Sequence, residues 1–308
     1  MTDAAVSSIG ALEIDDISKR YGAVVALDGM TLEVTAGEVF GFVGRNGAGK
    51  TTTMRIVLGV LGADGGEVRF AGRPLTFEAR RRIGYMPEER GLYPKMRLAE
   101  QLTYLAELHG MSPAAAMAGA RTWLERFGLI DRANDDVQSL SMGNQQRIQL
   151  AAALVFDPIM LVLDEPFASL DPVAVDVMSA VLREQADAGL PVIFSSHELE
   201  LVERICDRLA IVDRGKVVAQ GTIAELRMGA AERRLVDVPN AAVGWGEEIP
   251  GTTLISREGS EMLFEIEPGT DDQALLRAAL ATGAVREFHR VEPSLGDIFR
   301  SVLQEGAS

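Results

Sequence analysis

The chain has little of what secreted or membrane-spanning proteins require. Its 308 residues include a single cysteine, Cys206, so no intrachain disulfide can form, which fits a reducing compartment. The uncharged stretches of its apolar regions are short, such as residues 148–156 between Arg147 and Asp157, whereas a membrane span needs about 20 apolar residues. Residues 1–10 lack a basic segment followed by an apolar one, so we expect no signal peptide. These absences predict a protein that does not cross a bilayer by itself.

Positive charge is also scarce. The chain has 30 Lys and Arg against 45 Asp and Glu, a net charge of −15. Binding to a nucleic-acid backbone needs a basic surface, so we expect no nucleic-acid partner and no polybasic membrane anchor. Since 47% of the residues are hydrophobic, the chain can bury a core. Its length is about twice that of a typical domain of roughly 150 residues, which predicts two domains, or one large domain with an appendage.

Strands alternate with helices between residues 12 and 226, after an expected N-terminal tail of residues 1–11. This alternation predicts an α/β fold with a mostly parallel sheet. Residues 92–157, approximately, form a helical insertion, because leucines recur at helical spacing at 98, 102, 105 and 108. The expected strands are residues 32–34, 39–43, 67–70, 160–163 and 192–194, followed by a hairpin of residues 209–212 and 216–219.

Residues 229–308 have a different pattern and predict a small α+β domain. We expect strands at 253–257, 261–267 and 285–291 and helices at 271–282 and 294–303. This region shows no catalytic set of residues, and His289 within it is interpreted as structural. Cys206, in an apolar helical pattern, is interpreted as an inert core thiol.

A glycine-rich segment from Gly44 to Thr51 matches the pattern G-x-x-x-x-G-K-[ST], directly after an apolar run and before a helical segment. Glycines let backbone N–H groups turn toward an anion, and the N-terminus of the following helix adds partial positive charge. Lys50 is expected to reach the β- and γ-phosphates of a nucleotide, and the Thr51 hydroxyl to coordinate Mg²⁺. The candidate nucleotide-binding residues here are Gly44, Asn46, Gly47, Gly49, Lys50, Thr51 and Thr52.

Two adjacent acids, Asp164 and Glu165, follow the apolar run 160–163. Because neighbouring residues of a strand point to opposite faces, we expect the two to have different roles. Asp164 is the candidate Mg²⁺ ligand, and Glu165 the general base for an attacking water. His197 follows the run 192–194, at the sheet edge where ligands of open α/β folds collect, and is the candidate contact to the γ-phosphate.

The segment LSMGNQQR, residues 140–147, resembles the signature motif of ABC ATPases, usually written LSGGQ. The motifs occur in the order typical of that family over residues 12–225, which implies a P-loop ABC ATPase cassette with a helical subdomain. The resemblance adds three kinds of contact to bound ATP. It implies adenine stacking by Tyr21, contact from Ser141 and Gly143 of the signature, and a D-loop that contains Asp171. His197 corresponds to the switch histidine.

The resemblance also implies partners. Two cassettes, this chain and a copy or homologue, would meet head to tail around two Mg-ATP. Ser141 precedes a helical segment, so its hydroxyl, the Gly143 N–H and the helix dipole can face a γ-phosphate of the partner's nucleotide. A separate transmembrane permease would be driven by this dimer, with the cassettes cytoplasmic and peripheral on the inner face of the cell membrane.

Two departures from the family pattern stand out. The signature has Met142 and Asn144 where the family usually has Gly and Gln, while Ser141 and Gly143 are kept. Glu88 stands where the family normally has a glutamine that touches Mg²⁺ and the attacking water. Glu88 either coordinates Mg²⁺ as a carboxylate, or is turned away and only links the site to the partner.

Residues 84–93, GYMPEERGLY, resemble an export-type bacterial subgroup that includes NatA-like sodium extruders and drug-export ATPases. Residues 293–299, PSLGDIF, match a pattern at the end of that subgroup's accessory domain. The resemblance implies that a groove between the helical insertion and residues 84–93 receives the permease, with Leu92, Tyr93 and Met96 in contact.

The leading hypothesis is therefore an ATP-hydrolysing subunit of an ABC exporter. A soluble ABC ATPase without a transport role, such as an assembly or regulatory factor, is the alternative. A third hypothesis, a nucleotide-binding regulator that does not hydrolyse ATP, is disfavoured because Glu165 and His197 are intact.

Overall fold

The computed structural model of the chain describes residues 10–89, 91–228, 231–239, 241, 244–246, 249–267 and 269–305. The chain divides into two compact units, Met1–Thr222 and Ile223–Ser308. Most of the expected N-terminal tail, residues 1–9, lies outside the described residues, as do residues 229–230 at the expected start of the second domain and Arg90 of segment 84–93.

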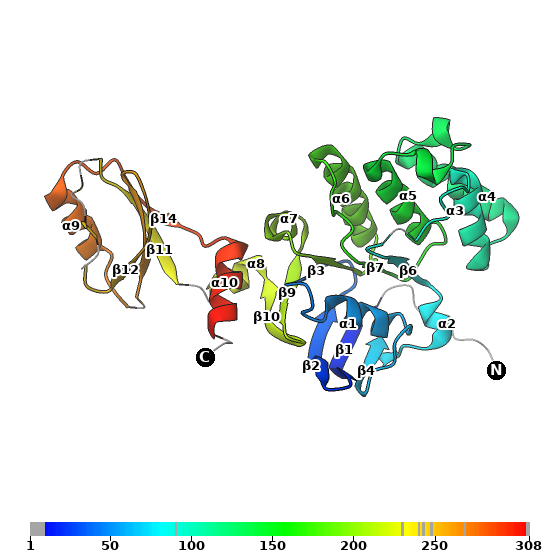
Figure 1. Cartoon of the computed structure of the whole chain (residues 1–308), viewed down its shortest axis with the longest axis horizontal. Coiled ribbons are helices and arrows are strands. Elements are labelled where there is room, and N and C mark those ends of the chain that lie inside the picture. Colours follow the sequence, from blue (N-terminus) through cyan, green and yellow to red (C-terminus); the bar gives the residue numbers. More distant parts are fainter. Residues whose placement is uncertain are drawn as a thin grey trace. The chain divides into compact units, whose positions relative to one another are not determined.

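A six-stranded sheet forms the centre of the first unit (Figure 1). Its strand order is β10-β9-β3-β8-β7-β6, and all neighbouring pairs are parallel except β9 and β10. Every residue of β3, β7 and β8 is buried, as the continuous apolar runs predicted. The fold class predicted from the sequence is therefore correct. The strands are β3 (Val39–Gly44), β6 (Ile83–Met86), β7 (Met160–Leu163), β8 (Val192–Ser196), β9 (Arg208–Asp213) and β10 (Lys216–Thr222).

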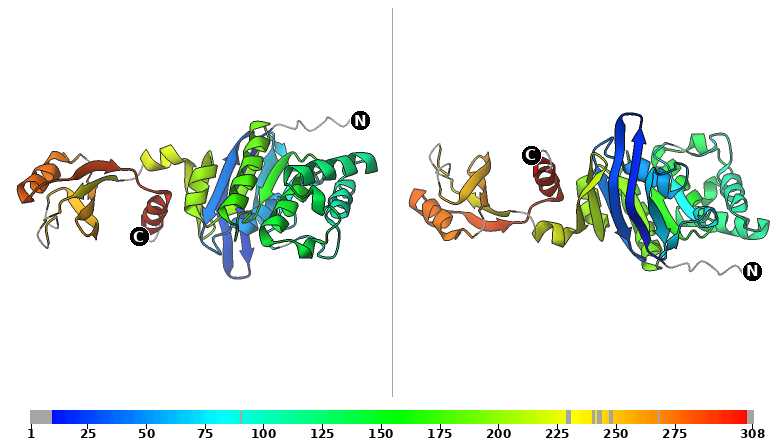
Figure 2. Two further views of the ribbon diagram at one scale, coloured as in Figure 1. Left: turned by 90° about the horizontal axis from the view of Figure 1, so that it is seen from above. Right: turned by 90° about the horizontal axis from the view of Figure 1, so that it is seen from below.

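A second, antiparallel sheet of order β2-β1-β4-β5 was not anticipated. It consists of β1 (Leu12–Tyr21), β2 (Val24–Val34), β4 (Gly65–Phe70) and β5 (Arg73–Pro74). The expected strands 32–34 and 67–70 belong here and not to the parallel sheet. Buried and exposed residues alternate over the last five residues of β2, as in a sheet with one face on the core. Figure 2 shows the hairpin of these two strands in dark blue.

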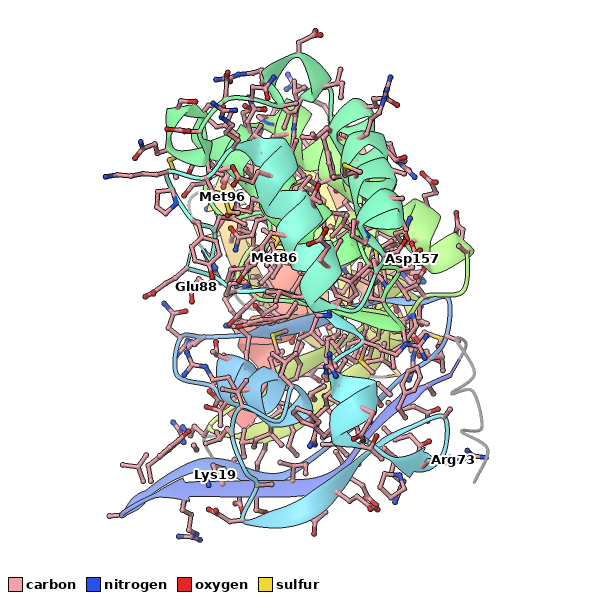
Figure 3. All side chains as sticks on the ribbon, turned by 90° about the vertical axis from the view of Figure 1, so that its right-hand side faces the viewer. Lys19, Arg73, Met86, Glu88, Met96 and Asp157 are labelled. Carbon is pink, nitrogen blue, oxygen red and sulfur yellow. The ribbon has the colours of Figure 1, made fainter. Side chains whose placement is uncertain are left out.

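Helices cover the parallel sheet, and three of them form the insertion after β6. These are α3 (Leu98–Leu108), α4 (Pro113–Arg126) and α5 (Met142–Leu154). The parallel sheet lies between this helical part and the antiparallel sheet (Figures 1 and 3). The remaining helices of the unit are α1 (Lys50–Val57), α2 (Phe77–Arg80), α6 (Pro172–Asp187) and α7 (Leu199–Ile205).

Cys206 caps the C-terminal end of α7. Its side chain is buried, and this burial raises the pKa of the thiol well above its ordinary value. A thiol of raised pKa is a weak nucleophile, which agrees with its interpretation as an inert core residue.

The second unit is an antiparallel sheet of order β12-β13-β11-β14 packed against helix α9. Val236, Met262 and Phe264 of the sheet form its core with Leu275 and Ala279 of the helix. His289 is more exposed than a core histidine, with Nδ1 3.6 Å from a Glu287 carboxylate oxygen. The elements are α8 (Ile223–Met228), β11 (Glu232–Asp237), β12 (Thr252–Glu258), β13 (Glu261–Ile266), α9 (Gln273–Thr282), β14 (Glu287–Val291) and α10 (Leu295–Glu305).

Candidate functional site

The glycine-rich loop connects the end of β3 to the start of α1. Gly47 and Gly49 have φ angles of +82° and +112°, which residues with a Cβ rarely adopt. A Cβ on Gly44 would lie 2.5 Å from the main-chain oxygen of Val212, so only glycine fits at this position. Gly49 is the N-cap of α1 and provides no side-chain cap, and the first turn has no acidic residue. The first N–H groups of α1 are therefore open to an anion.

Lys50, the first residue of α1, is held inside this loop. Its side chain is buried, and its Nζ donates a hydrogen bond of 2.7 Å to the main-chain oxygen of Gly44. The same Nζ lies 3.8 Å from Oε1 of Glu165. The Lys50 ammonium group is therefore held between the main chain of the loop and the Glu165 carboxylate.

The acidic pair lies just beyond β7, and here one sequence expectation is wrong. Asp164 and Glu165 do not point to opposite faces of a strand, because β7 ends at Leu163 and Glu165 has a φ of +50°. Both carboxylates are buried and line the same pocket. They differ instead in their partners: the Ser195 hydroxyl donates to Oδ1 of Asp164 at 2.6 Å and accepts from the main-chain N–H of Glu165 at 2.8 Å.

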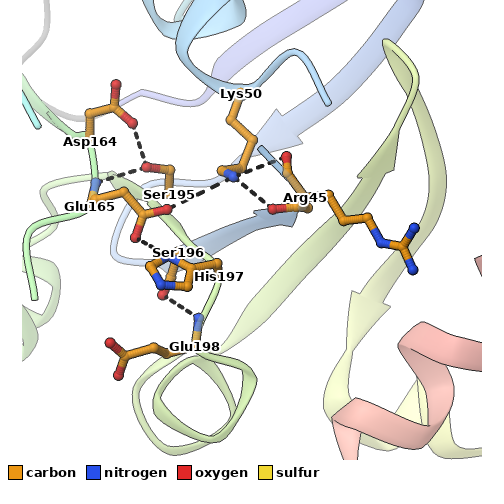
Figure 4. A network of polar contacts seen from close by, with 9 residues as sticks. Arg45, Lys50, Asp164, Glu165, Ser195, Ser196, His197 and Glu198 are labelled. Carbon is orange, nitrogen blue, oxygen red and sulfur yellow. Dashed lines mark hydrogen bonds and ion pairs between the residues drawn. The ribbon is translucent and has the colours of Figure 1, made fainter. Parts of the chain in front are cut away.

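His197 completes a chain of polar contacts (Figure 4). It follows β8, and its Nδ1 lies 2.9 Å from Oε2 of Glu165. One oxygen of Glu165 therefore faces Lys50 and the other faces His197. The imidazole is 58% exposed, so it can turn toward a ligand while the carboxylate stays buried.

A pocket of about 270 Å³ opens beside these groups. It brings together most of the residues that the sequence predicted, although they come from three separate segments. Its lining consists of Ala26, Arg45, Asn46, Gly47, Gly49, Lys50, Thr51, Thr52, Glu88, Asp164 and Glu165.

Four residues with predicted nucleotide contacts do not line this pocket: Ser141, Gly143, Asp171 and Tyr21. Ser141 is the exposed N-cap of α5 and makes no capping hydrogen bond, so its hydroxyl is available at an open helix end. Asp171 caps α6, where its Oδ1 accepts from the main-chain N–H of Ala174 at 2.8 Å. Tyr21 is half exposed at the end of β1. Their predicted contacts to nucleotide remain predictions.

Glu88 lies two residues after β6, beside the helical part (Figure 3), and is one of the residues that line the pocket. The Thr51 hydroxyl and the Glu88 and Asp164 carboxylates are the hard oxygen donors that Mg²⁺ prefers. Among the described residues, no three His, Cys, Asp or Glu side chains are grouped closely enough to hold a metal ion.

Sequence reasoning missed Ser195 and Gln149. Ser195 is fully buried and joins both acids, and its position at the carboxyl end of the strand beside β7 was the available signal. Gln149 of α5 donates to the main-chain oxygen of Pro87 at 2.7 Å, a contact across 62 residues of sequence that no local pattern reveals.

An apolar surface pocket of about 640 Å³ lies on the helical part. The exposed rings of Tyr93 and Tyr104 meet edge to face there, with centroids 6.2 Å apart. Met96 lines this pocket, whereas Leu92 lines a smaller one nearby. Within the part of the chain that the structure describes, no helix combines the length and apolar character needed to cross a bilayer.

Comparisons with known proteins agree with this geometry. The family model of the ABC transporter matches residues 27–168, and that of the C-terminal domain of DrrA1-3-like ATP-binding proteins matches residues 221–303. The chain is 38% identical over 288 residues to YhaQ, an uncharacterised ABC transporter ATP-binding protein of Bacillus subtilis (strain 168), covering 94% of this chain and 97% of YhaQ.

Two further matches each cover about 70% of the chain. The Nod factor export ATP-binding protein I of Paraburkholderia xenovorans (strain LB400) is 37% identical over 70% of this chain and 72% of its own length. A solved structure of an ATP-binding subunit of an ABC transporter superposes with a TM-score of 0.66 at 32% identity, covering 71% of this chain and 95% of that one.

Proposed function

The chain belongs to the family of ABC transporter ATP-binding proteins, and we propose that its pocket binds and hydrolyses Mg-ATP to drive the export of a substrate through a separate permease. The observation that carries the proposal is the meeting of Lys50, Asp164 and Glu165 at one phosphate loop, with Ser195 and His197 attached to the acids. Positioned charges of this kind supply most of the catalysis in phosphoryl transfer.

In this proposal the phosphates lie on the N–H groups of the loop and of α1. Lys50 has three donors; it donates to the main-chain oxygens of Gly44 at 2.7 Å and, more weakly, of Arg45 at 3.5 Å, and in the proposal the ammonium also donates to the β- and γ-phosphate oxygens. Thr51 and Asp164, together with Glu88, would hold Mg²⁺, which when bound neutralises charge on the phosphate oxygens. Glu165 accepts a proton from the attacking water, and His197 contacts the γ-phosphate.

Two chains are proposed to pair head to tail around two nucleotides. Support comes from Ser141 and Gly143, which lie at an open helix end and do not line the pocket of their own chain. An uncapped helix N-terminus with a free hydroxyl is suited to a phosphate group. The signature would therefore meet the nucleotide of a second copy or of a homologous cassette.

The export role and the permease rest on the relatives and on the apolar pocket. Relatives of this chain include a protein named for Nod factor export. The C-terminal unit of this chain matches the family model of the DrrA1-3-like domain. The apolar pocket at Tyr93, Met96 and Tyr104 offers a surface for a permease segment. The chain would then be cytoplasmic and peripheral on the inner face of the membrane.

The hydrolysis step is tested with Glu165→Gln. Phosphate release from ATP is expected to fall by a factor of at least about 100, because the carboxylate that accepts the proton is lost. The variant should also form a stable dimer that depends on Mg-ATP, measured by size-exclusion chromatography. Glu107→Gln, at an exposed position of α3, is the matched control and should behave like wild type. Equal rates in wild type and Glu165→Gln would refute the assignment of the base.

The transport step is tested by purifying the tagged chain from native membranes in mild detergent. We expect a stoichiometric partner that carries several apolar segments of about 20 residues each. If the chain is absent from the membrane fraction and only partners without such segments co-purify, the chain is an ABC ATPase without a transport role.

A further inference from the structure

Gln149 links the signature helix to the segment that carries Glu88. It lies on α5, is 3% exposed, and its Nε2 donates to the main-chain oxygen of Pro87 at 2.7 Å. The same Nε2 is 3.4 Å from the main-chain oxygen of Glu89. The residues before and after Glu88 are thus both held by one buried amide.

The oxygen atom of the Gln149 amide makes no hydrogen bond within the described parts of the chain. This oxygen, Oε1, is buried. A buried glutamine is unfavourable unless its hydrogen bonds offset the loss of water. The amide group of Gln149 is therefore satisfied only through its contact with residues 87–89.

Glu88 changes the charge balance of the nucleotide pocket. The charged residues of the lining are two cations and three acids: Arg45, Lys50, Glu88, Asp164 and Glu165. A glutamine at position 88 would have nearly the same shape but would leave two cations facing two acids. Nucleotide phosphates bring further negative charge, so the third acid opposes metal-free nucleotide and favours nucleotide bound with a divalent cation.

We propose that Gln149 is a positioning residue that keeps the Glu88 carboxylate at the pocket, and that it thereby makes nucleotide binding depend on a divalent cation. The inference rests on the proposed function, since it concerns the same nucleotide site. Glu88 acts here through its charge, whether it reaches the cation directly or through water. The main chain on either side of Glu88 is held by α5, the helix whose N-cap is Ser141.

The experiment measures binding of a fluorescent ADP analogue to the full chain, with EDTA and over a series of Mg²⁺ concentrations. The readout is the Mg²⁺ enhancement, defined as the Kd without Mg²⁺ divided by the Kd at saturating Mg²⁺. Five proteins are compared: wild type, Glu88→Gln, Gln149→Met, the double variant, and Gln145→Met. ADP is used so that neither hydrolysis nor dimer formation enters the measurement.

Glu88→Gln should lower the enhancement about tenfold, the scale of losses on changing groups around a metal site. Gln149→Met removes the donor at nearly constant volume and should lower the enhancement about three- to tenfold, because Glu88 is released from the pocket. In the Glu88→Gln background, Gln149→Met should cause no further change. This non-additivity separates positioning from a general structural effect.

Gln145→Met is the matched control. Gln145 lies one turn earlier on α5, is buried, and its Nε2 donates to the main-chain oxygen of Leu140 at 3.0 Å. Its replacement removes a similar hydrogen bond without touching residues 87–89, so the enhancement should stay at the wild-type value. Gln149→Ala serves in place of Gln149→Met if the latter does not fold.

Two results would overturn the inference while leaving the proposed function intact. One is a wild-type enhancement in the Gln149 variants. The other is an equal loss in both backgrounds, which would mean that Gln149 acts independently of Glu88. If wild type binds no ADP analogue at any Mg²⁺ concentration, both the inference and the proposed function fail.

Discussion

Replacing Ser195 by alanine removes the hydroxyl that joins the two acids of the site. In the folded chain this hydroxyl is fully buried, donates to Asp164 at 2.6 Å and accepts from the Glu165 N–H at 2.8 Å. Ser195→Ala leaves one buried N–H unpaired and takes a hydrogen bond from a buried carboxylate, at a cost of about 1–3 kcal/mol for such a buried group. We expect a loss of about 2–3 kcal/mol in the free energy of unfolding of the first unit.

Scanning calorimetry of the full chain measures this loss. For a unit of 150–250 residues, about 2–3 kcal/mol corresponds to a fall in Tm of about 4–12 °C. ATP hydrolysis should fall by roughly 10- to 100-fold, because Glu165 at its φ of +50° loses the contact that orients it. Ser196→Ala is the control: Ser196 is buried too, but within the described part of the chain its Oγ accepts from the Glu198 N–H at 3.0 Å and does not join the two acids. A Tm for Ser195→Ala no lower than that of Ser196→Ala would refute the reasoning.

Three further predictions concern other parts of the chain. Lys50→Ala should weaken ATP binding by at least about 100-fold, since an ionic contact to phosphate is lost; calorimetric titration with an unchanged Kd would contradict this. Ser141→Arg should abolish the ATP-dependent dimer in the Glu165→Gln background and leave ADP binding unchanged, as sedimentation and titration can check. Asp297 stabilises the second unit as an anion: desolvation raises its pKa, but hydrogen bonds from Ser294, Arg233 and Arg300 outweigh this and hold the pKa well below its ordinary value. A carboxylate of depressed pKa stabilises the fold above its unfolded pKa of about 4 and loses this contribution as the pH falls below it. The Tm difference between wild type and Asp297→Asn should therefore shrink below about pH 4, and a difference that is constant from pH 7 to pH 3 would count against it.

The phosphate loop was predictable because its conformation depends on local residues. Glycines with positive φ angles, the lysine at the first helical position and the preceding apolar strand are all contiguous in sequence. The parallel strands were predictable for a similar reason, because β3, β7 and the first three residues of β8 are continuous apolar runs buried on both faces. The signature motif likewise identified the family from eight adjacent residues, 140–147.

The antiparallel sheet and the geometry of Asp164 and Glu165 could not be predicted from local sequence patterns. Strand β1 has irregular alternation and several register shifts against β2, so its period-2 pattern is weak. The sequence predicted that Asp164 and Glu165 end the strand and point to opposite faces, but β7 ends at Leu163 and the chain turns through a positive φ at Glu165. The hydrogen bonds of Ser195 to both acids follow from the packing of β8 beside β7, which sequence spacing does not specify.

The sequence by itself therefore determined the family, the kind of ligand and the residues that bear charge, because each of these depends on residue type within a short segment. Only the tertiary structure decided which of those residues share a pocket, and which partner each one contacts. It separated Ser141, Gly143 and Asp171 from the pocket lining, brought Glu88 into it, and tied residues 87–89 to Gln149. These outcomes depend on contacts between segments far apart in the chain, and such contacts arise only when the strands and helices pack together.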